Sequence, residues 1–254
     1  MEPQMLNEVM LGDCLEKMLL IPDKSIDLIA ADLPFGTTRN AWDSVIPLPE
    51  LWVQYERVIK DNGAILLNAQ TPFDKVLGAS NLKLLRYEWI WEKTLATGHL
   101  NAKKMPMKAH ENILVFYKKL PTYNPIKTTG HARKVSKAEH KINSKMSTNY
   151  NPTGLTTYDS TERYPRSVLK FPTDKQKSAL HPTQKPVALV EYLIKTYTDP
   201  GDTVLDNVIG SGTTAIAAIN TGRNFIGIER DPGHHATAVN RIAQHLVDRM
   251  NQPF

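Results

Sequence analysis

The sequence predicts an α/β fold, in which helices cover both faces of a mainly parallel β-sheet. Short apolar runs typical of buried strands alternate with segments whose apolar residues recur at helical spacing. Two turns, at 32–36 and 210–214, directly follow predicted strands and are rich in Gly, Pro or small polar residues. Because such sheets bind ligands at the carboxyl ends of their strands, we expect both turns at the ligand-binding edge.

The first half of the chain gives most of the expected sheet. The apolar run Ile26–Ala31 reads as a buried strand that stops at Asp32-Leu33-Pro34-Phe35-Gly36. We expect Asp61-Asn62-Gly63 to form the turn that ends a helix over 49–59 and opens a strand over 64–68, because these residues favour turns. The further elements expected here are a helix over 73–82 and paired strands over 87–93 and 113–118.

The second half resumes the alternation after an interruption. Periodicity fades between 120 and 180, where Pro, Thr, Lys and Asn dominate and no firm element is assigned. Three regions follow: 1–119, the insertion 120–180, and 181–254. The elements expected in the last region are a helix around 190–197, a strand over 203–209, a helix from 213 through 218, a strand over 224–229 and a final amphipathic helix over 239–250.

Composition excludes several classes of protein. No run of about 18 apolar residues is present, so the sequence predicts no membrane span. The N-terminus lacks the basic and apolar pattern of a signal peptide. Cys14 is the single cysteine, which excludes a disulfide framework and favours a reducing, cytoplasmic location. The eight histidines show no metal-ligand spacing, and we interpret His110-Glu111 as surface or polar-packing residues rather than ligands.

Positive charge is concentrated in one stretch. Residues 99–180 carry 16 Lys and Arg against 5 Asp and Glu, whereas the remainder carries 15 against 21. One interpretation is a solvated basic loop. The other is a segment that faces a polyanion, because Lys and Arg that neutralise phosphates supply most nonspecific affinity for nucleic acid.

The turn after the strand that begins at Thr203 has the form of a cofactor-binding loop. Gly210 and Gly212 permit a sharp turn, and the helix N-terminus behind them favours a negative group such as a carboxylate. Glu229 ends the next strand, where an acidic residue can accept hydrogen bonds from both ribose hydroxyls of a nucleoside cofactor. A nicotinamide cofactor is an alternative, because Ala215 at the third glycine position is a permitted variant.

The turn after Ala31 can hold a flat ring that bears an amine. Asp32 and the carbonyl of Leu33, which the adjacent Pro34 helps to fix, can accept hydrogen bonds from an exocyclic amine. Two acceptors orient the nitrogen lone pair out of the ring plane, where it can attack a methyl group. Phe35 can stack on the ring, which is worth about 1–3 kcal/mol per base. The alternative is an ordinary turn with a buried Phe.

Four segments resemble one family in order and sequence. Asp32-Leu33-Pro34-Phe35 resembles the D-P-P-[YF] motif of the β-class DNA amino-methyltransferases, which methylate adenine N6 or cytosine N4, and 206–214 resembles their D-P-F-x-G-S-G-T-T loop. His181-Pro182-Thr183-Gln184-Lys185-Pro186 resembles their H-P-T-x-K-P segment, and Gly12-Asp13-Cys14 matches their opening. The resemblance implies a Rossmann-like, seven-stranded, mainly parallel sheet with an antiparallel hairpin edge and an inserted basic target-recognition region.

The resemblance also implies roles for individual residues. Asp32, Leu33, Pro34 and Phe35 are expected to hold a flipped-out base of double-stranded DNA, with the basic region 99–180 on the DNA. S-adenosylmethionine is the implied cofactor, and no metal is implied. Homodimers are common in the family, so a homodimer is a possible assembly. The residues expected to bind the cofactor are Asp13, Cys14, Asp32, Thr183, Lys185, Asp206, Gly210, Ser211, Gly212, Thr213, Thr214 and Glu229. Among these, Lys185 is assigned to the methionine carboxylate.

Two departures from the family pattern leave alternatives open. Leu33 replaces the first Pro of the catalytic motif, and Asn207-Val208 replaces Pro-Phe in the cofactor loop. A catalytically decayed DNA-binding relative and a protein side-chain amide methyltransferase therefore remain alternatives. Methylation of a cytosine ring carbon needs a cysteine nucleophile, usually after Pro. The single cysteine, Cys14, follows Gly12-Asp13 instead, so the sequence argues against this reaction. Asp as the first motif residue favours adenine N6 over the alternative, cytosine N4.

Overall fold

The computed structural model describes residues 5–36, 45–136, 157–173 and 185–251. The chain divides into two compact units, one formed by Met1–Asn124 with Ser167–Phe254 and the other by Pro125–Arg166. The smaller unit falls within the insertion expected over 120–180.

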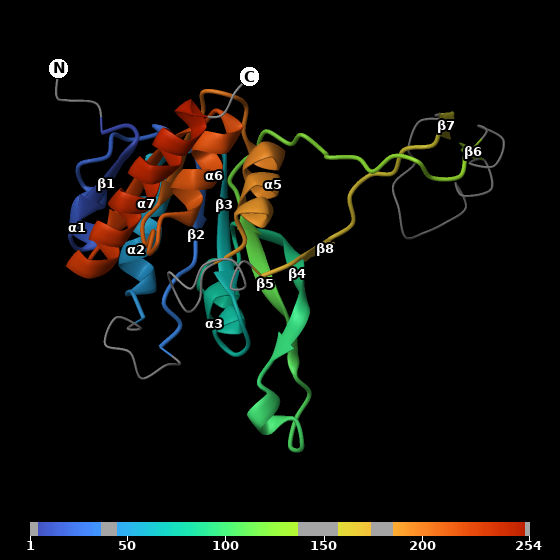
Figure 1. The fold of residues 1–254 in the computed structure, drawn as a ribbon, viewed down its shortest axis with the longest axis horizontal. Coiled ribbons are helices and arrows are strands. Elements are labelled where there is room, and N and C mark those ends of the chain that lie inside the picture. The colour runs from blue at the N-terminus through green and yellow to red at the C-terminus, as the bar shows by residue number, and fades with distance from the viewer. Residues whose placement is uncertain (1–4, 37–44, 137–156, 174–184, 252–254) are drawn as a thin grey trace. The chain divides into compact units, whose positions relative to one another are not determined.

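The larger unit is built on a mixed sheet that is parallel apart from one antiparallel strand. Its order among the described residues is β1-β10-β9-β2-β3-β5-β4-β8. Only β5 runs against its neighbours β3 and β4, which makes β4 and β5 a hairpin (Figure 1). The strands are β1 (Glu8–Leu11), β2 (Ile26–Ala31), β3 (Ile59–Ala69), β4 (Leu85–Thr97), β5 (Lys108–Phe116), β8 (Val168–Phe171), β9 (Thr203–Asp206) and β10 (Asn224–Glu229).

The α/β class and the antiparallel hairpin near one edge are confirmed, but the expected strand count is wrong by one. Within the described residues the sheet has eight strands, because β8 adds to β4 in parallel. The indole of Trp91 donates to the carbonyl of Phe171 at 3.0 Å and holds this edge. The sequence did not indicate β8 because its four residues lie in the stretch where periodicity fades.

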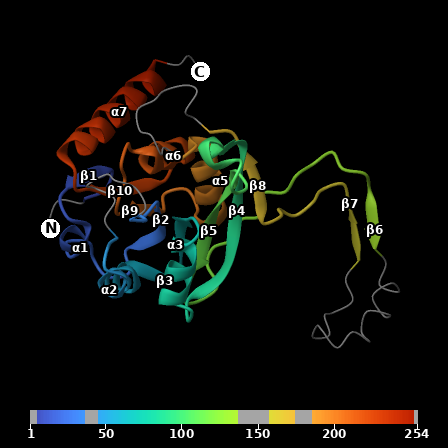
Figure 2. The ribbon, with the colours of Figure 1, turned by 90° about the horizontal axis from the view of Figure 1, so that it is seen from below.

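Helices cover both faces of the sheet (Figure 2). Alternation along β2 shows the two layers: Ile29 and Ala31 join the core under α1, α2 and α3, whereas Leu28 and Ala30 join the core under α5, α6 and α7. Each fully buried Leu or Ile contributes about 1.5–3 kcal/mol. The helices are α1 (Cys14–Met18), α2 (Leu48–Val58), α3 (Phe73–Ser80), α5 (Val187–Tyr197), α6 (Thr213–Thr221) and α7 (Pro232–Met250).

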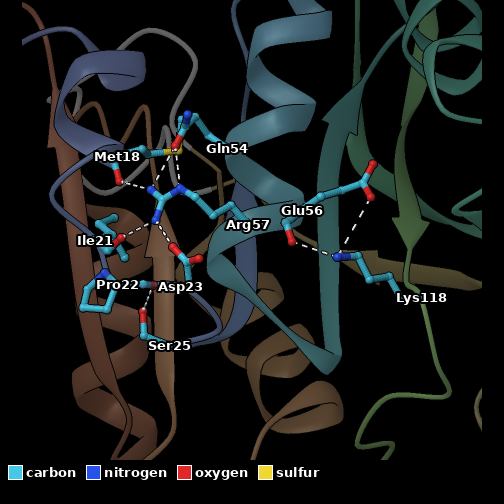
Figure 3. A network of polar contacts seen from close by, with 9 residues as sticks. All are labelled: Met18, Ile21, Pro22, Asp23, Ser25, Gln54, Glu56, Arg57 and Lys118. Carbon is cyan, nitrogen blue, oxygen red and sulfur yellow. Dashed lines mark hydrogen bonds and ion pairs between the residues drawn. The ribbon is translucent and has the colours of Figure 1, made fainter.

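Arg57 near the end of α2 ties that helix to the segment between α1 and β2 (Figure 3). Its guanidinium donates to the carbonyls of Met18 at 2.6 Å and Ile21 at 2.7 Å. It also forms an ion pair with Asp23 at 2.7 Å. These bonds satisfy carbonyls at and just past the end of the short helix α1 and so fix the chain that leads into β2.

The expected turn at Asp61-Asn62-Gly63 is wrong. These residues lie inside β3, which begins at Ile59. The pairing with β2 shifts from Ile26–Ile59 to Leu28–Ala64, so the three residues form an irregularity within the strand rather than a break before it. The bounds of β2 and β10 match the expectation, while β1 and α1 were not assigned from sequence.

The smaller unit contains a two-stranded antiparallel sheet of β6 (Lys134–Ser136) and β7 (Tyr158–Ser160). Arg133 forms two hydrogen bonds to Asp159, one at 2.7 Å, and Thr128 pairs with Arg163. The span 125–166 carries eight Lys and Arg against three Asp and Glu. None of the helices described in either unit has the length and hydropathy needed to span a bilayer.

Candidate active site

One cavity in the larger unit brings the two predicted turns together. Its volume is about 790 Å³. Both the segment after β2 and the glycine turn after β9 line it. The residues with an expected role that line this cavity are Asp13, Cys14, Asp32, Leu33, Pro34, Phe35, Lys185, Asp206, Gly210, Ser211, Thr213, Thr214 and Glu229. Thr183, with the rest of 181–184, lies outside the described residues.

Strand order explains why segments far apart in sequence meet here. β1, β10, β9 and β2 are parallel neighbours, so their carboxyl ends share one edge of the sheet. Gly12 donates its backbone N–H to the carbonyl of Glu229 at 2.9 Å, which places Gly12-Asp13-Cys14 beside the end of β10. These strand ends form one part of the cavity, and residues of β3, β4 and β5 line the rest of it.

The glycine turn combines a tight backbone with close helix packing. Gly210 has φ 54° and Gly212 has φ 83°, a region that strongly favours glycine. A Cβ at Gly212 would lie 3.4 Å from Ala238 of α7, so this glycine serves the turn and the packing of α7 and does not line the cavity. α6 begins at Thr213 without a side-chain cap, and Thr213 and Thr214 in its first turn line the cavity.

Glu229 stabilises the glycine turn from the end of β10. Its Oε2 accepts from the backbone N–H of Gly210 and its Oε1 from that of Asp231, both at 2.9 Å. The residue is buried yet lines the cavity. Since an ionised carboxylate offers about four lone-pair positions, both oxygens retain capacity to accept a ligand hydroxyl.

Asp206 and Asn207 line the cavity beside this turn. Asp206 accepts from the Thr214 hydroxyl at 2.6 Å and from the Val208 N–H at 3.1 Å, and burial raises the pKa of Asp206 to about 7. Tyr55 donates its hydroxyl to Asn207 Oδ1 at 2.6 Å. Asn207 Nδ2 is buried and has no hydrogen-bond partner among the described residues, so the lining keeps a donor that a polar ligand can satisfy.

Asp32, which follows the neighbouring strand β2 and lines the same cavity, is held by a lysine. Its Oδ2 accepts from Lys185 Nζ at 2.6 Å, whereas its Oδ1 is buried without a hydrogen-bond partner among the described residues. Burial raises the pKa of Asp32 above its usual value, and the Lys185 ammonium opposes this. Asp32 Oδ1 is therefore an acceptor to which no group in the described part of the chain donates.

Lys185 belongs to a buried chain of charges that the sequence did not reveal. Its Nζ also lies 3.0 Å from Glu111 Oε2, and Lys93 Nζ lies 2.6 Å from Glu111 Oε1. The side chains of Glu111 and Lys93 are each 7% exposed. Burial alone raises the pKa of Glu111, but Lys185 and Lys93 together hold it below its usual value. The order is Lys93–Glu111–Lys185–Asp32, and all four line the cavity.

A sequence signal for Glu111 exists. Glu111 and Asn112 lie in a strand whose following residues are all buried, so polar side chains there need buried partners. His110, the residue before, is exposed.

The assignment of Lys185 to a methionine carboxylate stays a prediction, and the structure gives its ammonium two further partners.

The remaining motif residues divide between core and cavity. The Leu33 side chain is buried in the core on the α1–α3 face, so the replacement of Pro is accommodated by apolar packing. Phe35 is partly exposed, lines the cavity, and contacts Phe73 with ring centroids 5.2 Å apart. Asp13 caps α1 by accepting from Leu15 N–H at 2.8 Å, and Cys14 is buried.

The fold and cavity define an α/β architecture in which the glycine turn after β9 and the Asp32 segment after β2 line one chamber. A family model described as DNA methylase matches residues 26–240. The chain is 32% identical over 234 residues to the DNA adenine methyltransferase YhdJ of Escherichia coli K12, covering 86% of this chain and 76% of that protein. It is 29% identical over 246 residues to the type II methyltransferase M1.MboII of Moraxella bovis, covering 88% and 92%.

The chain therefore belongs to the N6/N4 DNA methylase family and is an S-adenosylmethionine-dependent DNA methyltransferase. Solved structures support the fold. The M1.HpyAVI–SAM complex matches with a TM-score of 0.62 at 23% identity, covering 92% of this chain and 98% of that one. The cytosine-N4-specific PvuII DNA methyltransferase matches with a TM-score of 0.65 at 16% identity, covering 97% of this chain and 93% of that one.

Proposed function

We propose that this chain methylates the N6 amine of adenine at specific sites in double-stranded DNA. The observation that carries the proposal is the shared cavity. Asp32, with its unsatisfied oxygen, and the turn at Gly210 line the same chamber, so an amine and a methyl donor can occupy it together. Asp as the first residue of the motif supports adenine, as does the similarity to the E. coli DNA adenine methyltransferase YhdJ.

The residues around the glycine turn fit S-adenosylmethionine. Glu229 has acceptor capacity for the ribose hydroxyls, and the α6 N-terminus favours a carboxylate. Asn207 Nδ2 supplies an unsatisfied donor beside them. When bound, the cofactor supplies an activated methyl group on its sulfonium.

In the same cavity, the segment that follows β2 orients the amine. Asp32 and the backbone carbonyl of Leu33 accept the two amine hydrogens, which turns the lone pair out of the base plane. Phe35 provides an aromatic face on which the base can stack. The Asp32 carboxylate also stabilises positive charge that develops on nitrogen, so the contribution of the protein is orientation and electrostatics.

The target base must leave the duplex to enter this chamber, at a cost of a few kcal/mol that stacking and pocket hydrogen bonds offset. The basic surplus over 99–180 supports binding of the DNA backbone. Methylation of cytosine N4 is the second candidate, because the family model spans both amines.

The deciding experiment incubates the protein with unmethylated bacterial DNA and tritiated S-adenosylmethionine, and then digests the DNA to nucleosides for mass spectrometry. The expected product is N6-methyladenosine in its deoxy form. Sequencing of the treated DNA then gives the recognised context. N4-methylcytosine would transfer the proposal to the second candidate. Label in protein only, or no label, would support an amide methyltransferase or a decayed relative.

A further inference from the structure

The connection between β4 and β5 extends beyond α3 to a tip that is free of other elements (Figure 1). We call residues 95–108 the β4–β5 tip. It contains a single 3₁₀ turn, η1 (His99–Asn101), which Gly98 opens with φ 90°. The carbonyl of Asn101 accepts from the N–H groups of both Lys104 and Met105, at 2.8 and 3.0 Å. These bonds give the tip a defined backbone of its own.

The side chains of the tip combine positive charge with apolar surface. No Asp or Glu occurs between Glu92 and Glu111, while Lys103, Lys104 and Lys108 lie within this span. All residues from 97 to 110 are exposed. Leu100 is 88% exposed, and Leu95, Met105 and Met107 are also exposed large apolar residues. A cluster of this kind indicates a contact surface rather than scattered surface residues.

The base of the tip forms part of the rim of the active-site cavity. Leu95, Ala96, Thr97 and Lys108 line the same chamber as Asp32. Lys108 Nζ lies 3.4 Å from Gln70 Oε1, which holds its ammonium at this rim. Because a flipped nucleotide stays joined to its strand, the duplex must lie at the mouth of the chamber, where the tip projects.

We propose that the β4–β5 tip docks onto double-stranded DNA beside the target base, with Lys103 and Lys104 against phosphates and Leu100 and Met105 inside a groove. The proposal rests on the proposed function for the position of the DNA. Lysines neutralise phosphates and release counterions, which favours binding irrespective of sequence. Apolar side chains placed between base steps help other proteins to unstack and kink a duplex. Charge complementarity therefore favours DNA as the partner of this surface.

The first test is photocrosslinking to DNA from a single cysteine introduced into the tip. Cys14 is the only cysteine and is buried, so Leu100→Cys adds one accessible thiol for an azidophenyl photocrosslinker. The probe is a radiolabelled 30-bp duplex. Leu82→Cys is the matched control, because Leu82 is also highly exposed, at 69%, but precedes β4 at the opposite end of that strand. We expect cross-linking to DNA from position 100 at several times the yield from position 82.

The second test measures affinity for the same duplex as a function of salt. Lys103→Ala/Lys104→Ala is expected to weaken binding at least about fivefold and to lower the slope of log K against log salt by about 1.8, since each phosphate contact contributes about 0.9. The control pair is Lys75→Ala/Lys83→Ala, which removes equal charge near α3, and its slope is expected to stay within error of the wild type.

Equal cross-linking from positions 82 and 100, or unchanged binding by Lys103→Ala/Lys104→Ala, would overturn the proposal. So would a position-100 cross-link to a second copy of the protein in place of DNA. The two proposals fail separately. DNA that becomes methylated without a contribution from the tip sinks only the docking proposal, whereas tip-dependent binding without methyl transfer sinks only the proposed function.

Discussion

Glu111→Gln is expected to destabilise the fold strongly, because Glu111 compensates two buried ammonium groups. Lys93 and Lys185 approach it at 2.6 and 3.0 Å, and the three side chains are at most 10% exposed. Removal of one partner from a buried ion pair typically costs about 3–5 kcal/mol, because the remaining charge is left in a poorly solvated site. We expect a loss of about 3 kcal/mol here, since Asp32 still neutralises Lys185.

The assay is urea unfolding followed by tryptophan fluorescence, with far-UV circular dichroism to test whether the two transitions coincide. Glu92→Gln is the matched control. Glu92 lies on β4 and pairs with Lys170 of β8 at 3.1 Å, but its side chain is 45% exposed. Exposed ion pairs contribute about 0–1 kcal/mol, so this variant is expected to unfold close to the wild type.

The double variant Lys93→Met/Glu111→Gln tests whether the unpaired ammonium of Lys93 causes the loss of stability in Glu111→Gln. If burial of unpaired charge causes the loss, removal of Lys93 as well should recover part of the stability. Additive losses in the double variant, or equal effects of Glu111→Gln and Glu92→Gln, would refute the account of this network.

Two further predictions concern the carboxylate of Asp32, which we propose binds the amine, and the buried carboxyl of Asp206. Asp32→Ala and Asp32→Asn are expected to lose most methyl transfer to DNA while binding S-adenosylmethionine with near wild-type affinity, measured by filter binding and calorimetry; wild-type turnover in Asp32→Ala would contradict the assignment. Burial raises the pKa of Asp206 to about 7, above its unfolded value, so its contribution to stability is full below about pH 4 and is lost as pH rises through 7. Asp206→Asn should therefore reduce the dependence of the urea midpoint on pH between pH 4 and 7. The same pH dependence in this variant as in the wild type would argue against the Asp206 carboxyl as its cause.

Local sequence patterns predicted the segments that depend on local chemistry. β2 and β10 are mostly apolar runs bounded by turn residues, and their bounds agree with the structure. The glycine turn was recognisable because φ values of 54° and 83° lie in the left-handed region that strongly favours glycine. Their convergence at one edge followed from the rule that parallel strands bring their carboxyl ends together.

Nonlocal pairing explains what the sequence did not show. β8 has four residues and becomes a strand only because β4 offers a free edge, so no periodicity marks it. Glu111 appears as one polar residue next to an exposed His110. Its burial depends on pairing between β4 and β5 and on Lys185, which lies 74 positions further along the chain. Spacing within a segment carries no information about such a partner.

Lys185→Met distinguishes two roles for this lysine. If the ammonium binds the methionine carboxylate, the variant should lose affinity for S-adenosylmethionine but keep its affinity for methylthioadenosine, which lacks that carboxylate. If it positions Asp32, transfer at saturating cofactor should fall while both affinities stay close to wild type. The distances of 2.6 Å to Asp32 and 3.0 Å to Glu111 favour the second result, because both carboxylates already surround the ammonium.

We therefore expect a loss of turnover of at least about tenfold in Lys185→Met, equivalent to about 1.4 kcal/mol in the activation barrier, with a change in cofactor Kd below about threefold. Lys195→Met is the control, because Lys195 lies on the adjoining helix α5 in an exposed pair with Glu191. A selective loss of S-adenosylmethionine binding in Lys185→Met would instead assign its ammonium to the cofactor and leave Asp32 to be oriented by the backbone alone.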